Sequence, residues 1–495
     1  MLMGRATASA GEGSFSRDPT TARHQKVVLI NTTIGALMAS LDASIMTVSL
    51  PTIARDLHTG VGLMLWIMMG YTVMITALLL PFGRLADIHG RVKLYGIGFI
   101  VFTLSSALCG FSPSGTFLLV GRLIQGIGAA LLWSNSTAIL TDAFPRQGRG
   151  FALGINQVAA LSGSVGGLLL GGVITATLGW RWIFFVNLPI GLFGAVWTFV
   201  ALSEIATMDR GERFDWSGMA LFVVSIVLLL LGLTEIIEGH PALVPWLMGA
   251  GGLGLLWFVW VESRASSPMI DLRLFRNRLF AFGNLSLFLN ALARGALMFL
   301  LTFAFQGFDG NSPLVAGIKM LPLSIAIIVV GPIAGRMSDR IGSRELSSGG
   351  LLITAVSLVI LARSGLSGYT LLAVGLALAG IGNGLFNSPN TSAVMGAVPP
   401  DRRGVAASTR TLLFNTGQLF SMGMSFAILA GVMGSAKLSG FLAGADVTAA
   451  ASGHAAFAHG LTEAFMVSAV LSVVAAGLSA LRGSGESPRA SMAAR

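Results

Sequence analysis

A single carboxylate, Asp42, interrupts the apolar stretch 27–50, which is long enough to cross a membrane as a helix. An ionisable side chain at such a position is costly unless it faces a cavity or a partner of opposite charge. Asp42 lies eight residues before Leu50, or about 12 Å from that end at 1.5 Å per residue. Arg122 lies six residues into the stretch 116–140, about 9 Å from the same side of the membrane. The two side chains are therefore predicted to meet.

The chemistry that suits such a pair is the uptake and release of a proton. Removal from water favours the protonated form of Asp42, whereas a guanidinium beside it favours the carboxylate. We therefore interpret Asp42 as the group that exchanges a coupling proton, with Arg122 as its partner. A structural ion pair that fixes two helices against each other is the alternative interpretation.

A short motif occurs twice in the chain and divides it into two similar halves. The pattern Gly-Arg-x-x-Asp-x-x-Gly begins at Gly83 and again at Gly335. Its two aspartates, Asp87 and Asp339, are 252 residues apart. A repeat at half the chain length predicts a duplicated architecture.

The same offset exposes a difference between the halves. Arg294 stands at the position that corresponds to Asp42, and Lys319 lies about 10 Å deep in its own apolar stretch by the helical rise. A cavity with this net positive charge favours anionic or neutral amphipathic ligands. Snorkelling to the membrane surface is the alternative, and it is easier for Lys319 than for the more central Arg294.

Four further side chains are candidates for lining a substrate cavity. Met46 lies on the same helical face as Asp42. Trp66, Tyr71 and Trp133 offer aromatic surfaces that suit flat amphipathic ligands. For Trp66, anchoring at the membrane surface is the alternative.

The elements that must position these residues are membrane helices. Of the 495 residues, 54% are hydrophobic and only 11% charged, and these values exclude an ordinary soluble protein. Apolar stretches of spanning length predict fourteen helices, at residues 27–50, 62–82, 93–112, 116–140, 150–175, 182–203, 216–236, 243–261, 279–305, 313–335, 346–364, 369–392, 403–433 and 461–481.

The positive charges give the orientation. An even number of helices places both termini on one side, and the tails and alternate loops of that side collect most of the Lys and Arg. The other side has only Arg55, Arg181, Arg363 and Lys437. Both termini are therefore predicted to be cytoplasmic.

The repeat also defines the domains. Six helices in residues 26–203 match six in residues 279–481, and the helix pair within 204–278 has no counterpart. The predicted fold is an all-α integral membrane protein with fourteen helices arranged 6 + 2 + 6 and parallel repeats. Residues 1–25 and 482–495 are predicted to be cytoplasmic tails, the first of them disordered.

Composition and motifs argue against several other classes of function. The single Cys109 and six histidines without ligand spacing indicate no metal centre. The net charge of +10 comes from short loops rather than a basic patch that alternates with aromatics, so no nucleic acid partner is expected. The sequence has no phosphate-binding Gly-x-x-x-x-Gly-Lys-Ser/Thr loop, no nucleophile with a base and no filter loop. An ATP-driven pump, an enzyme, a channel and a bound cofactor are therefore not expected.

The six plus six helices and the duplicated motif resemble the major facilitator superfamily, and the fourteen helices resemble its drug:proton antiporter branch. The resemblance covers nearly the whole chain, from about Lys26 to Leu481. The residues that carry it, beside the duplicated motif, are Leu41–Pro51 in the first helix, Arg122, Gln125, Gly126, Gly128 and Ala130 in the fourth, and Trp180–Phe184, Asn187 and Pro189 at the sixth.

The fifth helix is similar to the antiporter motif in its glycines, although Leu168 stands where that motif has proline. Glycines at such intervals permit close helix packing, and a proline would add a bend. These glycines are Gly154, Gly163, Gly167, Gly171 and Gly172.

The resemblance further implies a cytoplasmic gate at the first copy of the motif. There Asp87 would face the N-terminal end of the helix that begins near Gly404, and Arg91 would bridge Asp87 and Asp142. The second copy lacks a counterpart of Asp142, so a weaker gate is expected. A basic loop that only sets topology is the alternative. The gate residues are thus Gly83, Asp87, Gly90, Arg91, Asp142 and Asp339.

The function implied by the resemblance is secondary active efflux by alternating access, with the substrate bound between the halves. We expect proton-coupled antiport of amphipathic drugs or toxic compounds by a monomer in the bacterial inner membrane. A dedicated exporter of an anionic metabolite, lipid or siderophore-like molecule is the alternative within transport. The expected partners are a small-molecule substrate, protons and the lipid bilayer.

Overall fold

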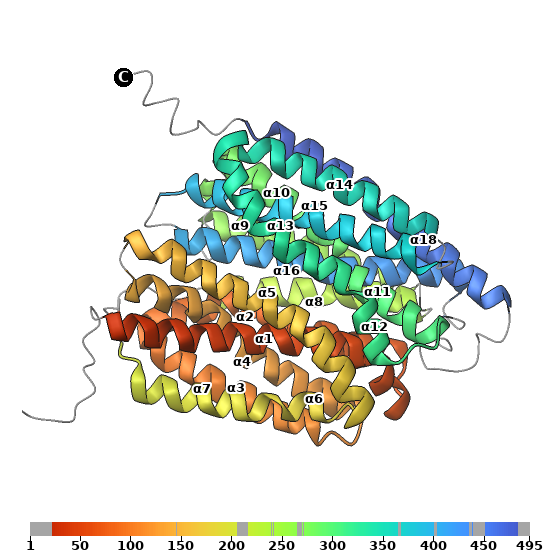
Figure 1. The fold of residues 1–495 in the computed structure, drawn as a ribbon, viewed down its shortest axis with the longest axis horizontal. Helices are drawn as coiled ribbons and strands as arrows, with labels where there is room; N and C mark the ends of the chain where they lie inside the picture. Colours follow the sequence, from red (N-terminus) through yellow and green to blue (C-terminus); the bar gives the residue numbers. More distant parts are fainter. Residues whose placement is uncertain are drawn as a thin grey trace, which may run out of the picture.

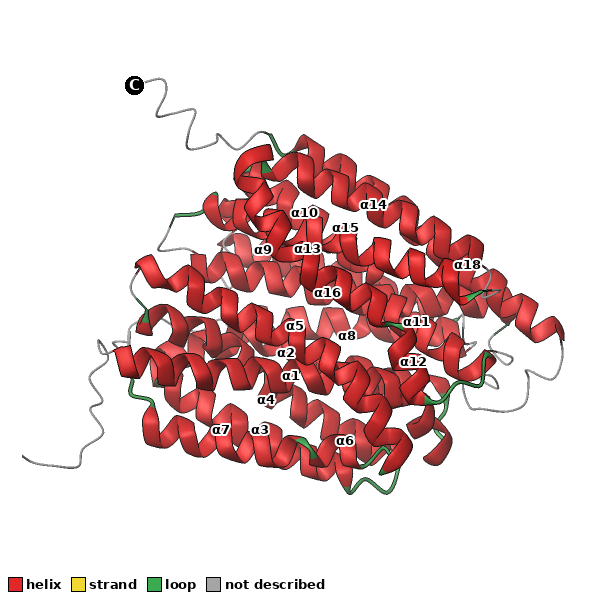
Figure 2. Cartoon of the chain, in the orientation of Figure 1, coloured by secondary structure: helices red, strands yellow, loops and turns green. Residues whose placement is uncertain are grey.

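The protein is built from long helices, as Figure 2 shows. In the computed structural model, the described residues are 22–144, 146–204, 216–238, 240, 242–264, 270, 272–364, 368–399, 403–434, 438 and 451–483. These residues form helices, turns and loops, without a strand. Fourteen helical segments are long and apolar enough to cross a membrane. The predicted all-α class and the predicted number of membrane helices are confirmed.

The helices follow one another along the chain with short connections. Those of the first half are α1 (Ala22–Asp56), α2 (Val61–His89), α3 (Arg91–Gly110), α4 (Gly115–Ala143), α5 (Arg146–Thr177), α6 (Trp182–Phe185) and α7 (Asn187–Ala201). A pair follows, α8 (Trp216–Glu238) and α9 (Val244–Arg264). The 3₁₀ helix η1 (Leu272–Arg276) precedes the second half, which contains α10 (Arg278–Arg294), α11 (Leu297–Phe303), the π-helix η2 (Ala304–Phe308), α12 (Pro313–Lys319), α13 (Leu321–Ile341), α14 (Ser343–Ser364), α15 (Tyr369–Gly396), α16 (Arg403–Met433) and α18 (Ala451–Leu481).

Three predicted spans are broken rather than continuous. The span predicted at 313–335 divides into α12 and α13 at Met320, because Pro322 has no N–H and occupies the first turn of α13. The span predicted at 279–305 divides at Gly295 and ends in η2, and the span at 182–203 divides at Val186. Apolar length alone does not reveal such breaks.

The first copy of the duplicated motif is the end of a helix rather than a loop. α2 continues to His89, and only Gly90 separates it from α3. Gly90 has φ = 105°, a left-handed backbone conformation that glycine adopts without steric strain. The second copy has the same form, since α13 ends at Ile341 and Gly342 has φ = 102°. The two copies therefore share a backbone geometry as well as a sequence pattern.

The helices form two bundles that lie side by side in Figure 1, α1–α7 in one and α10–α18 in the other. α8 packs against both α2 and α16, so it lies at the junction between the bundles, and α9 packs against α8. α1 begins and α18 ends at the same end of the molecule, on the left of Figure 1. We call this the terminal end and the opposite one the distal end.

The structure changes the predicted boundaries of both tails. Residues 1–21 and 484–495 lie outside the described residues, whereas α1 already begins at Ala22. Arg482, which we expected in the second tail, is 2% exposed. It donates hydrogen bonds to Asn390 Oδ1 on α15 at 2.9 Å and to Ser347 Oγ on α14 at 3.3 Å. The second bundle therefore extends at least to Arg482.

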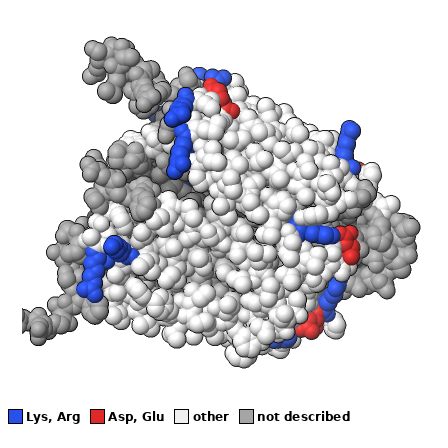
Figure 3. Space-filling view, in the orientation of Figure 1, with Lys and Arg blue, Asp and Glu red and all other residues white. Residues whose placement is uncertain are grey.

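The surface is suited to a lipid environment. In the view of Figure 3, charged side chains gather at the two ends and an uncharged band lies between them. On α9, Trp246 and Leu256 are 78% and 69% exposed. Apolar surface of this extent is unfavourable in water, so the molecule is a multi-pass membrane protein.

Candidate functional site

Asp42 lies in a closed hydrogen-bond network inside the first bundle. Arg122 Nη1 on α4 lies 2.7 Å from Asp42 Oδ2. Gln125, one turn further along α4, donates from Nε2 to Asp42 Oδ1 at 3.0 Å and accepts from Arg122 Nη1 at 2.6 Å. Asp42 is 2% exposed and Arg122 1% exposed. The structure thus brings the two predicted residues together and shields them from water.

A third donor reaches the carboxylate from the start of α7. Asn187 Nδ2 donates to Asp42 Oδ1 at 2.8 Å and to Ser106 Oγ on α3 at 3.1 Å. The role of Asn187 was not predicted. An amide side chain within an apolar span is nevertheless a sequence signal for a buried hydrogen bond. Asp42 is therefore held by donors from two helices, α4 and α7.

Tyr71 and Met46 are buried, which differs from the expectation that they line a cavity. The Arg122 guanidinium carbon lies 4.2 Å from the centre of the Tyr71 ring, a cation–π contact, and Tyr71 is 3% exposed. Met46 is 1% exposed and belongs to the largest hydrophobic cluster. Tyr71 therefore covers the ion pair, and Met46 is part of the core.

Glycines on α5 allow α1 to approach closely enough to position Asp42. A Cβ atom would lie 2.5 to 3.0 Å from the backbone of α1 at Gly163, Gly167 and Gly171. These positions recur every four residues and form one face of α5. Gly154 has open space around it and takes no part in this contact.

Glycines also fix α4, which carries Arg122. A Cβ atom at Gly126 would lie 2.7 Å from Tyr71 O on α2, and one at Gly128 would lie 2.5 Å from Phe102 N on α3. Because neither position has room for a side chain, α4 packs tightly between α2 and α3. The depth of Arg122 is thereby set by backbone contacts.

The two bundles touch at the distal end through α5 and α12. A Cβ atom at Gly172 would lie 2.6 Å from Leu314 Cα, and one at Gly317 would lie 2.7 Å from Leu168 O. Leu168, which replaces the proline of the antiporter motif, is fully buried. Two glycines thus let the helices cross with their backbones almost in contact.

A buried hydrogen bond also joins the bundles. Gln306 Nε2 on η2 donates to Val48 O on α1 at 2.7 Å, and Gln306 is 6% exposed. Separation of the bundles at this point would break the bond.

At the terminal end, two of the predicted gate residues form an ion pair. Arg91 Nη1 lies 2.6 Å from Asp142 Oδ2, and each side chain is about a quarter exposed. Gly83 lies in α2, where an added Cβ atom would make only an ordinary contact with Ser134 Cβ at 4.0 Å. The side chains of Asp87 and Asp339 are outside the described part of the structure.

Glu204, just after α7, is a further residue of this region that was not predicted. Its carboxylate accepts hydrogen bonds from the backbone N–H groups of Arg91 and Val92 at the start of α3. A negative charge is favourable at a helix N-terminus. Gly90 leaves the required space, since a Cβ atom there would lie 3.0 Å from Glu204 Oε2.

The two predicted cations of the second bundle have different environments. Lys319 Nζ lies 2.8 Å from Asp309 Oδ2, so the charge that we expected in the cavity is balanced at the distal end. Arg294 is partly buried on α10, and its Nε is buried without a hydrogen-bond partner. Of these two cations, Arg294 is the one without a counter-ion among the described residues.

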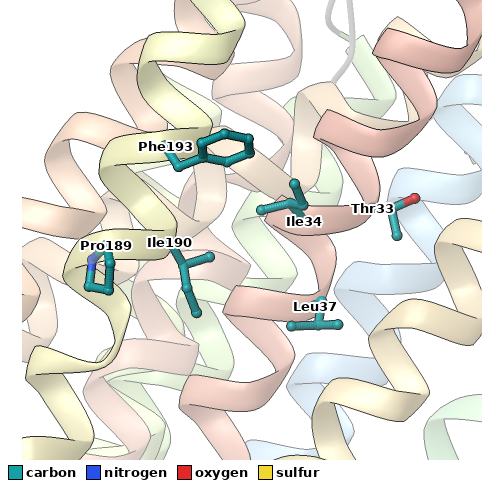
Figure 4. Close-up of a pocket in the computed structure, with 6 residues that line it drawn as sticks. All are labelled: Thr33, Ile34, Leu37, Pro189, Ile190 and Phe193. Carbon is teal, nitrogen blue, oxygen red and sulfur yellow. The ribbon is translucent and has the colours of Figure 1, made fainter.

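Trp66 and Trp133 are partly buried and pack against hydrophobic clusters of the bundle. A groove of about 530 Å³ lies elsewhere, between α1 and α7 (Figure 4). It faces outward, because Phe193 at its edge is 48% exposed. Its lining consists of Thr33, Ile34, Leu37, Pro189, Ile190 and Phe193, none of which was a predicted site residue.

Comparison with known proteins identifies relatives over most of the chain. The model of the Major Facilitator Superfamily matches residues 32–269 and 283–491. The chain is 33% identical over 404 residues to the riboflavin transporter RibZ of Clostridioides difficile (strain 630), covering 81% of this chain and 87% of that protein. It is 34% identical over 419 residues to the multidrug resistance protein Stp of Mycobacterium tuberculosis (strain CDC 1551 / Oshkosh), covering 83% and 76%.

A solved structure has the same fold. It is the crystal structure of a bacterial homologue of the human lysosomal transporter Spinster, with a TM-score of 0.66 and 17% sequence identity, covering 93% of this chain and 97% of that one. The chain therefore belongs to the Major Facilitator Superfamily and is a membrane transporter rather than an enzyme.

Proposed function

We propose that this chain is a proton-coupled efflux transporter of amphipathic drugs or toxic compounds. It acts as a monomer in the bacterial inner membrane, with its terminal end in the cytoplasm. The orientation rests on the concentration of Lys and Arg in the tails and loops of that side.

The observation that carries the coupling proposal is the buried Asp42 with its three donors. As a carboxylate, Asp42 accepts from Arg122, Gln125 and Asn187. Protonation removes the negative charge and turns one acceptor oxygen into a donor, so Arg122 loses its counter-ion. A proton at Asp42 thus changes the contact between α1 and α4, and this change is the coupling step.

The distal contacts support an alternating-access cycle. In this structure α5 and α12 pack at Gly172 and Gly317, and Gln306 binds the backbone of α1. Their separation opens the distal side, while the Arg91–Asp142 region closes the cytoplasmic side. Glycine contacts suit such a movement, because no interlocking side chain has to be withdrawn.

The names of the relatives support a small organic substrate. One relative is named for riboflavin and another for multidrug resistance. We place drugs and toxic compounds first, since one relative carries that description at 34% identity. The second candidate is a dedicated exporter of an anionic metabolite, and the unbalanced Arg294 favours it.

The test is efflux of carboxyfluorescein, an anionic dye, and rhodamine 123, a cationic one, from efflux-deficient bacteria. Wild type, Asp42→Asn and the control Asp309→Asn are compared with and without a protonophore. Asp309 is a suitable control because it pairs with Lys319 outside the Asp42 network. We expect dye efflux in the wild type and Asp309→Asn that the protonophore abolishes, and loss of this efflux in correctly inserted Asp42→Asn. Efflux that ignores the protonophore would contradict the proposal.

A further inference from the structure

Two guanidinium groups in the second bundle stand without partners in the described structure. Neither Arg294 on α10 nor Arg410 on α16 has a hydrogen bond or an ion pair there, and the Nε of each is buried and unpaired. Two other cations within the membrane helices have a carboxylate partner, Arg122 in Asp42 and Lys319 in Asp309. Arg294 and Arg410 are therefore two positive charges of the second bundle that have neither a counter-ion nor a hydrogen bond among the described residues.

Arg294 is too deep to reach the membrane surface. It lies 16 residues after the start of the span Arg278–Gln306, about 24 Å by the helical rise, and twelve residues before its end. One turn earlier, Asn290 is 1% exposed, and both polar atoms of its side chain are without a hydrogen-bond partner. Buried polar groups are normally paired, so an unpaired cation beside an unpaired amide indicates a site for a ligand.

The internal repeat explains why no protein group fills this site. Arg294 corresponds to Asp42, whose partners Arg122 and Gln125 come from α4. With the offset of 254 that aligns the glycines of α4 and α15, the corresponding positions are Leu376 and Ala379. Both are fully buried and apolar. The second bundle thus has a charged residue, Arg294, at the position of Asp42. It has apolar residues where the first bundle has the hydrogen-bond partners of Asp42.

Arg410 lies along the same pair of helices. α10 packs closely on α16 at Gly295, where a Cβ atom would lie 2.8 Å from Gln418 Cα. Arg294 is therefore at the level of Gln418. Arg410 comes eight residues earlier on α16, about 12 Å nearer the terminal end. The two cations therefore lie at two different depths along the packed helices α10 and α16.

Uncompensated cations in an interior of low dielectric are unfavourable unless an anion joins them. A fixed carboxylate would balance them permanently and would compete with an anionic ligand. A carrier of anions requires positive charges that have no fixed counter-ion and that the transported anion balances.

We propose that Arg294, with Asn290 beside it, binds the anionic group of an amphipathic organic anion, and that Arg410 receives this group nearer the cytoplasm. The inference rests on the proposed function, since the anion is taken to be the exported substrate. Binding itself requires neither proton coupling nor transport.

The experiment measures equilibrium binding of carboxyfluorescein and rhodamine 123 to the purified full-length protein in neutral detergent, by fluorescence anisotropy. The two dyes share a ring system and differ in charge. The variants are Arg294→Gln, Arg294→Lys and Arg410→Gln. The matched control is Arg264→Gln, because Arg264 stacks on Trp260 of α9, which packs on α8 rather than on α10 or α16.

We expect Arg294→Gln to weaken binding of the anionic dye at least about tenfold, because it removes a charge-assisted contact. Arg410→Gln weakens it by a smaller factor, and Arg294→Lys, which keeps the charge, retains part of the affinity. Rhodamine 123 binding stays unchanged in all variants, and Arg264→Gln changes neither dye.

Unchanged binding of the anionic dye in both Gln variants would overturn the proposal. So would an equal loss of both dyes in Arg294→Gln and Arg294→Lys, because this would indicate a structural role. If the protein couples efflux to protons but binds only the cationic dye, the inference fails and the proposed function stands. If it binds the anion through Arg294 without proton-dependent efflux, the inference stands and the coupling fails.

Discussion

Asn187 Nδ2 lies 2.8 Å from Asp42 Oδ1, although 145 residues separate the two in the chain. The contact adds a donor from α7 to those that α4 supplies through Arg122 and Gln125. In the proposed coupling, a proton that binds Asp42 has to replace one of these donors, so part of the network opens. We therefore expect proton exchange at Asp42 to accompany movement of α1 relative to α4 and α7.

Asn187→Leu removes one donor and keeps a side chain of similar size. Because Asp42 then loses one of its three donors, we expect the pH profile of coupled efflux to shift. Dye efflux from proteoliposomes between pH 5 and 9, a range chosen to be about two units either side of neutrality, measures this shift. Asn135→Leu is the control, because Asn135 is fully buried on α4 and binds only within that helix. The same profile in Asn187→Leu and wild type would show that Asn187 does not act on Asp42.

Gly167→Ala tests the close contact between α1 and α5. Its Cβ atom would lie 2.7 Å from Leu41 O and 2.8 Å from Ser44 Cβ, so the helices must move apart. Such overpacking costs typically about 1–3 kcal/mol and lowers the melting temperature of the purified protein.

The neighbouring Gly166 provides the matched control, because a Cβ atom there meets open space. Gly166→Ala is expected to be neutral or to stabilise by up to about 1 kcal/mol through its helix propensity. Equal melting temperatures of the two variants would be incompatible with the packing described.

Gly317→Ala tests whether the contact of α5 with α12 belongs to one state of a cycle. The added Cβ atom would lie 2.7 Å from Leu168 O, so the state closed at the distal end becomes less favourable. With spin labels at Thr177 and Ser312, which are both exposed near this contact, the distance distribution shifts toward longer distances. Gly331→Ala, in open space on α13, leaves the distribution unchanged. A distribution that is the same in all three proteins would contradict a distal gate.

Arg482→Ala tests the buried end of the second bundle. Burial lowers the pKa of the Arg482 guanidinium to about 10, so it remains charged at neutral pH. Its loss leaves Asn390 Oδ1 without its donor, at a cost of about 1–3 kcal/mol, and lowers the melting temperature. Arg336→Ala, at an exposed position on α13, changes stability by no more than about 0.5 kcal/mol. Comparable stability of both variants would mean that Arg482 is only a tail residue.

The sequence predicts the helices and one central contact well, because both follow from short-range rules. Apolar length identifies the membrane spans, and the helical rise places Asp42 and Arg122 at similar depths. The sequence does not reveal three partners, Asn187, Glu204 and Asp309. Each of them lies in a different helix or loop from the group that it binds. Their contacts depend on how α1, α3 and α7 pack and on where α12 begins.

Burial is a second property that the sequence does not determine. Tyr71 and Met46 are residue types that often line cavities. Whether such a side chain faces a cavity or the core of a bundle depends on the neighbouring helices. Arg482 follows the last apolar stretch and looks like part of a tail, yet Asn390 and Ser347, both distant in sequence, bind it.

The most direct test of the central claim is proton release by the purified protein when it binds its preferred dye in weakly buffered solution. The proposed coupling predicts release of a proton by wild type and none by Asp42→Asn, which still binds the dye. Proton release of equal size from the Asp42→Asn variant would contradict the assignment of the coupling proton to Asp42.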